Sequence, residues 1–184
     1  GKSEIAADVA ARSGAEIVSA DAFQIYRGLP FLTAQPDQAT MEKAPHHLVG
    51  SVPLTEEMSA EKFRVLASTA IEEINRRGRL AIVAGGSGLY IKALTDGLAP
   101  LPAMNPKLRA ELNALSLEEL NARLAAIDPL GATEIDQQNK RRVVRALEIF
   151  TQTGAPASRQ RSQWNHATEP AGGVLLMRDR SELY

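Results

Sequence analysis

The 184-residue sequence predicts an α/β fold in which a parallel sheet is flanked by helices and is followed by an all-helical insertion. Helical and strand-like segments alternate over residues 1–95, and this alternation is typical of parallel sheets covered by helices. The strand-like segments are short apolar runs, as expected of strands buried on both faces. Residues 105–154 contain only helical patterns, so we expect them to lie outside the sheet.

The first half of the chain carries the elements of the sheet. A helical pattern starts at Lys2 and is closed by Gly14, and Ser59 begins a second helix with a capping pattern. Four prolines punctuate residues 28–57, which we expect to form a loop. In order, the patterns predict a helix at 2–12, a strand at 16–20, a helix at 59–77, a strand at 80–84 and a helix at 89–95.

The pattern changes after Pro100-Leu101-Pro102. We predict helices at 106–114, 117–127 and 140–153, and a strand at 172–177 that returns to the sheet. The expected organisation is a core at 1–102, a helical insertion at 103–165 and a return to the core at 166–184.

The composition excludes several classes of protein. The sequence has no cysteine, which excludes disulfide scaffolds and cysteine-based zinc sites. Aromatic residues make up 4% of the chain, which disfavours the base-stacking platforms of RRM and OB folds. No apolar run approaches the roughly 18 residues that a membrane span needs. We therefore expect a cytoplasmic protein with no membrane partner.

The charge is unevenly distributed, although the net charge is only −1. Residues 1–138 carry 13 Lys and Arg against 18 Asp and Glu, whereas residues 139–184 carry 8 against 4. A basic segment on a nearly neutral protein is expected either to contact a polyanion or to form a solvated helix face.

The first helix begins with Gly1-Lys2-Ser3, which matches the end of a phosphate-binding P-loop. In such a loop, backbone N–H groups at a helix N-terminus hold phosphates, the lysine reaches the terminal phosphates and the hydroxyl binds Mg²⁺. The rest of that motif and its strand would precede Gly1, so we expect them to be missing from this sequence. The alternative is an ordinary helix start.

Two further segments follow predicted strands, at the edge where open α/β sheets bind their ligands. Asp21 follows the first strand and can serve as a general base, as a Mg²⁺ ligand or as a turn residue. Gly85-Gly86-Ser87-Gly88 follows the second strand. Its glycines either admit a substrate close to the backbone or form a tight turn, and Ser87 can donate or accept a hydrogen bond.

Two other motifs have simpler alternatives. His46 and His47 are neighbours in an extended segment and point to opposite sides, so we expect structural roles rather than a metal pair. Arg141, Arg142 and Arg145 lie near one face of a predicted helix, which suits phosphate contacts. Alternatively, Arg145 forms an ion pair with Glu148, three residues further on.

Taken in order, these segments resemble the tRNA dimethylallyltransferases, also called tRNA isopentenyltransferases. That family shows G-K-[ST], S-x-D-[SA]-x-Q-x-Y-x-G, T-A-K-P, P-H-H-L, G-G-[TS]-x-L-Y and R-R-x-x-R-A-L-E. The matching segments here are Gly1-Lys2-Ser3, residues 19–28, Thr33-Ala34-Gln35-Pro36, Pro45-His46-His47-Leu48, residues 85–90 and residues 141–148.

The resemblance implies a P-loop NTPase-like fold and transfer of a dimethylallyl group from dimethylallyl pyrophosphate to N6 of the adenosine beside the anticodon of tRNA. It implies that Gly1, Lys2 and Ser3 hold the pyrophosphate, that Ser3 binds Mg²⁺, and that Asp21 and Lys2 are catalytic. The tRNA would contact Asp21, Ala22, Phe23, Gln24, Ser87, Arg109, Arg141, Arg142, Val143, Val144 and Arg145. We expect the protein to act as a monomer on the anticodon stem-loop.

The sequence departs from the family pattern at several positions. The family usually has M-D-I-G where this chain has Leu29-Pro30-Phe31-Leu32, and Gln35 replaces a lysine. Ala22 stands where serine is commoner, and the family's further catalytic arginine would lie beyond Tyr184. These departures predict that a carboxylate and a cation are missing near the site.

Three other functions stay open at this point. The chain also fits an adenylate isopentenyltransferase, which makes a cytokinin precursor. It fits a kinase of the P-loop type as well. The departures leave room for a non-catalytic tRNA-binding relic.

Overall fold

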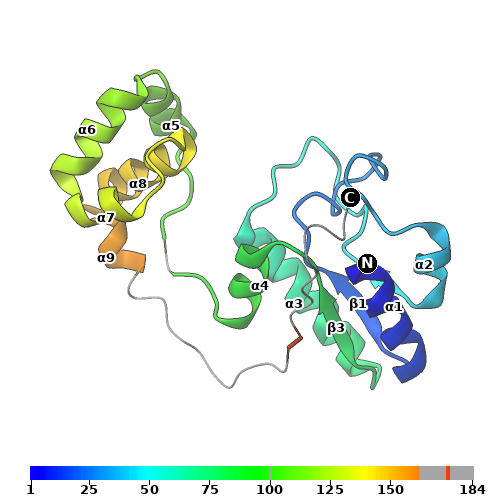
Figure 1. The fold of residues 1–184 in the computed structure, drawn as a ribbon. Helices are drawn as coiled ribbons and strands as arrows, with labels where there is room; N and C mark the ends of the chain where they lie inside the picture. Colours follow the sequence, from blue (N-terminus) through cyan, green and yellow to red (C-terminus); the bar gives the residue numbers. More distant parts are fainter. Residues whose placement is uncertain (100, 162–172, 175–184) are drawn as a thin grey trace. The chain divides into compact units, whose positions relative to one another are not determined.

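The computed structural model describes residues 1–99, 101–161 and 173–174 (Figure 1). These residues fall into two compact units. One contains Gly1–Gly97, and the other begins at Leu98.

The described part of the first unit contains a parallel sheet of three strands in the order β2-β1-β3. In the central strand, Ile17 pairs with His46 on one side and with Ile82 on the other. The strands are β1 (Glu16–Ser19), β2 (His46–His47) and β3 (Ala81–Ala84), and the helices are α1 (Lys2–Ser13), α2 (Gln38–Lys43), α3 (Ala60–Arg76) and α4 (Gly88–Thr95). The predicted parallel sheet with flanking helices is therefore present.

Both faces of the sheet are covered, because successive side chains of a strand point to opposite faces. Val18 packs in one cluster with Phe63 of α3 and Tyr90 of α4, whose rings stack with centroids 4.2 Å apart. Ile17 packs in another cluster with the alanines of α1. This arrangement explains why β1 is a continuous apolar run rather than an alternating one.

The segment at 28–57 is not only a loop, as the sequence analysis expected, because it contains α2 and β2. Helix α2 is capped by Asp37, whose carboxylate accepts a hydrogen bond from the Thr40 N–H at 2.8 Å. Strand β2 is two residues long and exists through its pairing with β1. Elements this short produce no periodic pattern in a sequence.

The two histidines of β2 lie on opposite faces of the sheet, as predicted. His47 contacts Glu16, a buried carboxylate with 4% of its surface exposed, at 2.7 Å, and Arg77 donates to the same oxygen at 2.7 Å. The hydrogen bond with His47, together with Arg77, holds the pKa of Glu16 below its ordinary value against the opposing effect of burial. His47 therefore stabilises a buried charge.

The second unit consists of helices in its described part. They are α5 (Pro106–Asn113), α6 (Leu117–Ile127), α7 (Pro129–Glu134), α8 (Lys140–Thr153) and α9 (Ala157–Arg161). The core of the unit contains Leu120 and Leu124 of α6 with Val143 and Leu147 of α8. The three helices predicted here are confirmed to within one residue.

Neither α7 nor α9 was predicted from the sequence. Both depend on the buried Asp128, whose carboxylate accepts hydrogen bonds from the Gly131 N–H at 2.8 Å and from the Ser158 hydroxyl at 2.6 Å. A hydrogen bond between residues 158 and 128 cannot be recognised from any pattern of neighbouring residues in the sequence.

The strand predicted at 172–177 lies outside the described residues, apart from Gly173 and Val174, which belong to neither a helix nor a strand. Within the described ranges, no helix combines the length and the apolar character that crossing a membrane would require.

Candidate active site

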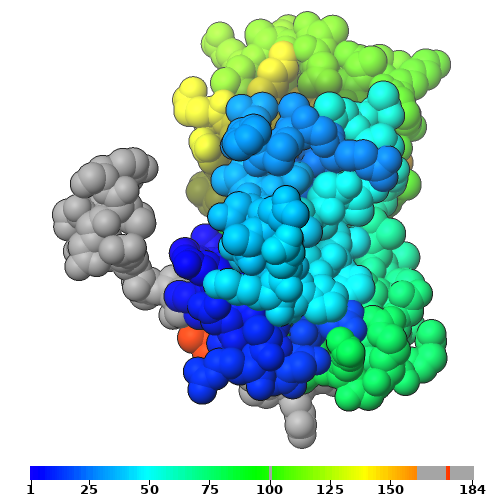
Figure 2. All heavy atoms as spheres, turned by 90° about the vertical axis from the view of Figure 1, so that its right-hand side faces the viewer, coloured from blue at the N-terminus to red at the C-terminus, as the bar shows by residue number. Residues whose placement is uncertain are grey.

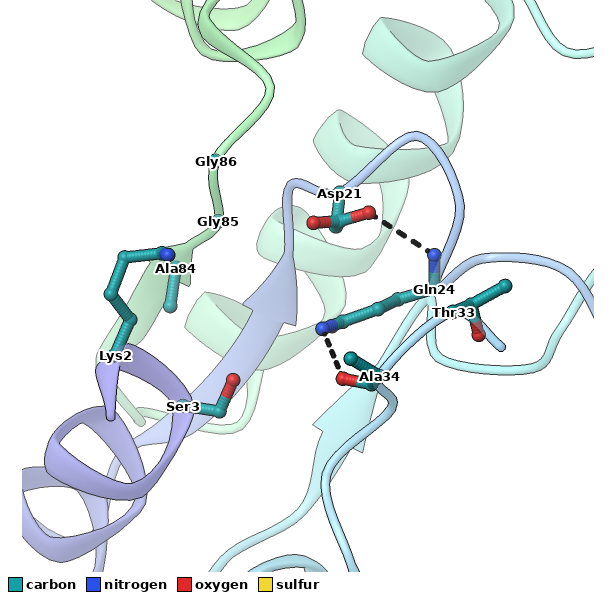
Figure 3. Close-up of a pocket in the computed structure, with 9 residues that line it drawn as sticks. All are labelled: Lys2, Ser3, Asp21, Gln24, Thr33, Ala34, Ala84, Gly85 and Gly86. Carbon is teal, nitrogen blue, oxygen red and sulfur yellow. Dashed lines mark hydrogen bonds between the residues drawn. The ribbon is translucent and has the colours of Figure 1, made fainter. Parts of the chain in front are cut away.

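One pocket brings together the residues that the sequence predicted for phosphate binding and for proton transfer. It has a volume of about 280 Å³ and is bordered by the start of α1, the segments that follow β1 and β3, and the turn at residues 33–34. Figure 3 shows Lys2 and Ser3 on one side of the pocket and Asp21 and Gln24 on the other. A ligand in this pocket therefore lies between a cation with a hydroxyl and a carboxylate.

The topology of the sheet explains this meeting. Because β1 and β3 are parallel neighbours, their carboxyl ends reach the same edge, where ligands of open α/β sheets bind. Helix α1 leads into β1 from the opposite direction, so its first turn lies at this edge too. Figure 2 shows the start of α1, in the darkest blue, exposed on the surface.

The ends of β1 and β3 approach closely because residue 85 is glycine. A Cβ atom at Gly85 would overlap the backbone carbonyl of Ala20. Ser87 then joins the two segments, since its N–H donates to the Ala20 carbonyl at 3.1 Å and its hydroxyl accepts from the Ala22 N–H at 2.9 Å. Ser87, predicted to contact tRNA, thus also fixes the loop that carries Asp21.

Asp21 is held in place through one of its carboxylate oxygens. Oδ1 accepts hydrogen bonds from the N–H groups of Phe23 at 2.9 Å and Gln24 at 3.2 Å, which closes the turn after β1. Figure 3 shows the other oxygen directed away from that turn, on the side of the pocket where Lys2 lies. One oxygen thus orients the group while the other is available to a substrate.

Lys2 and Ser3 lie in the first turn of α1, for which Gly1 is the N-cap residue. Neither side chain has a hydrogen-bond or ion-pair partner among the described residues. Backbone N–H groups at this end of a helix carry partial positive charge, and the Lys2 ammonium adds a full one. This side of the pocket is therefore suited to an anion.

Gln35 occupies the position where the resemblance led us to expect a missing cation. Its Nε2 donates to the carbonyls of Gln24 at 2.9 Å and Tyr26 at 2.7 Å. Gln35 does not line the pocket, so its amide ties the turn at residues 33–36 to the loop after β1. Similarly, the carbonyl of Pro30 accepts from the Gln35 N–H at 2.9 Å.

The surface beside this turn is apolar. Phe23, predicted to contact tRNA, has an exposed fraction of 69%, and Phe31 has one of 99%. Ala22 lies between Asp21 and Phe23 and contributes its backbone to the Ser87 bond described above.

The second unit places Arg109 and Arg145 around one buried carboxylate. Glu148 is fully buried and accepts hydrogen bonds from Arg145 at 2.7 Å, from Arg109 at 2.8 Å and from the Asn105 N–H at 2.8 Å. Burial raises the pKa of Glu148, but these three bonds outweigh burial and hold it below its ordinary value. The ion-pair alternative for Arg145 is thus realised.

The other predicted contacts on α8 separate into two groups. Arg141 and Arg142 are exposed, and their side chains have no partner among the described residues. Val143 and Val144 have exposed fractions of 0% and 2% and belong to the core of the unit. Their side chains pack inside the unit, so a tRNA contact at these two positions stays a prediction and would involve the backbone.

The pocket contains the type of ligand that Mg²⁺ prefers. Ser3 contributes a hydroxyl oxygen and Asp21 a carboxylate oxygen, and Mg²⁺ is often held by one or two such groups with substrate phosphates. Across the described ranges, no group of three or more His, Cys, Asp or Glu side chains is arranged to hold a metal ion. The residues therefore fit a magnesium ion that is shared with a phosphate ligand.

Thr33, Ala34 and Ala84 of the site were not assigned from the sequence. Thr33 and Ala34 line the pocket, and the Ala34 carbonyl accepts a hydrogen bond from the Gln24 side chain at 2.8 Å. The signal was present in the Thr33-Ala34-Gln35-Pro36 segment, which the sequence analysis matched to a family motif without giving it a role.

The chain is similar to several known proteins. A family model described as IPP transferase matches residues 24–184. The chain is 45% identical over 184 residues to a tRNA dimethylallyltransferase of Akkermansia muciniphila, and 44% identical over 188 residues to tRNA dimethylallyltransferase 1 of Citrifermentans bemidjiense. Each alignment covers 100% of this chain, and the chain spans 62% and 61% of these relatives' lengths.

Solved structures give the same result. A eukaryotic dimethylallyltransferase acting on tRNA matches with 28% identity and a TM-score of 0.75, over 90% of this chain and 42% of that one. A tRNA isopentenylpyrophosphate transferase of Bacillus halodurans matches with 37% identity and a TM-score of 0.54, over 85% of this chain and 53% of that one. These matches confirm the predicted P-loop-like α/β fold class.

Proposed function

The chain belongs to the IPP transferase family, and we propose that it transfers a dimethylallyl group from dimethylallyl pyrophosphate to N6 of the adenosine adjacent to the anticodon in tRNA. One observation carries this proposal: Lys2, Ser3 and Asp21 line the same pocket. An anionic leaving group beside the first two residues faces a carboxylate that can take a proton. The names of the relatives support tRNA as the acceptor.

The reaction uses the two sides of the pocket differently. The bond between C1 of the dimethylallyl group and the pyrophosphate oxygen breaks, and a bond between C1 and N6 forms. The pyrophosphate leaves with the bonding electron pair beside Lys2 and the first turn of α1, whose positive potential stabilises the charge that develops there. The proton lost by N6 passes to Asp21.

Asp21 is needed because an exocyclic adenine amine is a weak nucleophile. A carboxylate that accepts its proton in the transition state contributes about 10²–10⁴-fold to the rate. A Mg²⁺ ion held by Ser3 would neutralise charge on the pyrophosphate.

The target base must leave the anticodon stack to enter the pocket, which costs a few kcal/mol. In this proposal, residues 1–102 form the core that holds the reacting groups and residues 103–165 form the tRNA-binding insertion. Phe23, Gln24, Ser87, Arg141 and Arg142 contribute RNA contacts. The protein acts in the cytoplasm as a monomer.

A transfer assay tests the proposed function. Purified protein is incubated with MgCl₂, labelled dimethylallyl pyrophosphate and either unmodified tRNA or AMP. We expect label in tRNA and none in AMP. Label in AMP would instead identify an adenylate isopentenyltransferase, and phosphate transfer from ATP alone would identify a kinase. Binding of tRNA without transfer of label would identify a non-catalytic binding protein.

Exposed arginines on α8 are expected to set part of the salt dependence of tRNA binding. The double substitution Arg141→Ala and Arg142→Ala removes up to two phosphate contacts, and each lost contact lowers the slope of log K against log salt by about 0.7–0.9. Filter binding between about 50 and 200 mM salt measures that slope.

The matched control is Arg12→Ala with Arg76→Ala, which removes the same charge from exposed positions on α1 and α3. Equal slopes of log K against log salt for the wild type and the α8 variant would show that this face of α8 is only a solvated helix surface.

A further inference from the structure

The two histidines of β2 have different surroundings. His47 is accounted for by its contact with Glu16. His46 uses only one ring nitrogen: Nδ1 lies 2.7 Å from the carbonyl of Ala44. Because a carbonyl can only accept, Nδ1 carries the hydrogen and donates it. In the neutral ring, Nε2 is then a hydrogen-bond acceptor.

Nε2 of His46 is buried and has no hydrogen-bond partner among the described residues. Buried polar atoms without a protein partner are rare in native proteins, and such atoms commonly bind an ordered water molecule. The surroundings of this atom show which partner it can have.

Nε2 belongs to a ring that lines a second, smaller cavity of about 10 Å³, close to the volume that one water molecule requires. Four polar side chains border this cavity: Ser3 of α1, Ser19 of β1, Gln24 and His46. The Gln24 side chain is already bonded, since its Oε1 accepts from Ser19 and its Nε2 donates to the Ala34 carbonyl. The pairing of β1 with β2 places His46 beside Ile17, whose side chain packs against α1, and Ser19 lies two residues further along the same strand face. Ser3, Ser19 and His46 thus meet on the α1 side of the sheet.

The smaller cavity adjoins the candidate active site. Ser3, Gln24 and Ala84 border both, whereas His46 borders only the smaller one. His46 therefore lies behind the site and reaches a ligand only through an intermediate group. Ser3 is a suitable intermediate, since its hydroxyl has no partner among the described residues.

A serine that presents its oxygen lone pairs to a cation or a phosphate-bound metal must direct its hydrogen elsewhere. Partners behind a ligand that fix its orientation are often as important as the ligand itself. No hydrogen bond joins the hydroxyls of Ser3 and Ser19 among the described residues, and the Ser19 hydroxyl donates its own hydrogen to Gln24 Oε1 at 3.2 Å. It does keep lone pairs that can accept a hydrogen bond.

We propose that His46 is a positioning residue that orients Ser3 through one water molecule in the smaller cavity. The water accepts the hydrogen of Ser3 and donates its own hydrogens to His46 Nε2 and to Ser19 Oγ. All polar groups of the cavity are then satisfied, and the oxygen of Ser3 faces the pyrophosphate pocket. This inference rests on the pyrophosphate role proposed for Ser3.

Two substitutions of His46 separate this role from simple packing. His46→Asn keeps a donor near the position of Nδ1 and loses the Nε2 acceptor. His46→Gln reaches the position of Nε2 and loses the Nδ1 donor. We expect His46→Asn to weaken the affinity for inorganic pyrophosphate in MgCl₂ by about 10-fold in calorimetric titrations. We expect His46→Gln to stay within about 3-fold of the wild type.

A double-mutant cycle tests whether His46 acts through Ser3. In a Ser3→Ala background, His46→Asn is expected to cause no further loss of pyrophosphate affinity, because the hydroxyl that it orients is absent. His47→Gln is the control, since it alters the Glu16 cluster and leaves pyrophosphate affinity unchanged. A loss of similar size with and without the Ser3 hydroxyl would overturn the proposal, as would weaker binding by the Gln variant than by the Asn variant.

Two measurements on the wild type do not depend on activity or on folding of the variants. Long-range ¹H–¹⁵N NMR is expected to show the tautomer with hydrogen on Nδ1, and a crystal structure is expected to show one water within hydrogen-bond distance of Nε2 and of Ser3 Oγ. An empty cavity or the opposite tautomer rejects the inference. If this water is observed and the double-mutant cycle shows coupling between His46 and Ser3, but tRNA receives no label, only the proposed function fails. If tRNA is labelled but the losses of pyrophosphate affinity in the two variants are additive, only the inference about His46 fails.

Discussion

Replacement of Asp21 by asparagine is expected to lower the single-turnover rate of dimethylallyl transfer by about 10²–10⁴-fold. The reason is specific to one oxygen of the side chain. Oδ1 closes the turn after β1 by accepting from the N–H groups of Phe23 and Gln24, and an asparagine carbonyl can accept the same bonds. The substitution thus keeps the turn and removes the basic oxygen that takes the proton.

Binding measurements complete this test. The affinities for pyrophosphate and for tRNA are expected to stay within a few-fold of the wild type in Asp21→Asn, whereas Asp21→Ala also opens the turn and weakens tRNA binding. Asp37→Asn is the matched control, because Asp37 caps α2 with the same kind of bond and does not line the pocket. A normal single-turnover rate in Asp21→Asn would show that another group accepts the proton.

Replacement of Glu148 by glutamine is expected to destabilise the second unit by about 3 kcal/mol. The buried carboxylate accepts bonds from Arg109, from Arg145 and from the Asn105 backbone, so a neutral amide leaves two guanidinium groups without their anion. Removal of one partner from a buried charge cluster is costly because the remaining charge stays poorly solvated. Hydrogen exchange of amides in α6 and α8 reports the stability of this unit directly.

The pH dependence gives an independent check on the same residue. The pKa of Glu148 is below its ordinary value of 4.5 in the folded protein, so its contribution is fully present above that value and is lost as the pH falls through the folded pKa. The difference between wild type and Glu148→Gln should therefore shrink in acid. The control Glu111→Gln, at an exposed position of α5, should match the wild type at every pH.

The longer helices were predictable because their signals are local and repeated. Helices α6 and α8 have the bounds that the sequence predicted, since each combines a capping residue with several turns of apolar spacing. The shorter elements α2, β2 and α7 had no such repetition. They depend on single side chains, such as Asp37 and Asp128, or on pairing with another strand.

The candidate site divides in the same way. Lys2, Ser3 and Asp21 could be predicted because each directly follows or begins an element whose end must lie at one edge of a parallel sheet. The partners of Arg109 and Gln35 could not be predicted, and the ion pair of Arg145 with Glu148 was one of two alternatives. A side chain that can bind a phosphate can equally bind a carboxylate or a carbonyl of its own chain.

By itself, the sequence determined the order and approximate bounds of the longer elements and the three groups that carry the proposed chemistry. Periodicity and capping depend on residues that are close together in the chain, so they can be recognised in the sequence alone. Only the tertiary structure decided which charged groups bond with other groups of the protein and which remain available to a ligand. Glu148 bonds with Arg109, 39 positions away, and Nε2 of His46 has no partner within the described part of the chain, because hydrogen-bond partners depend on distance in space.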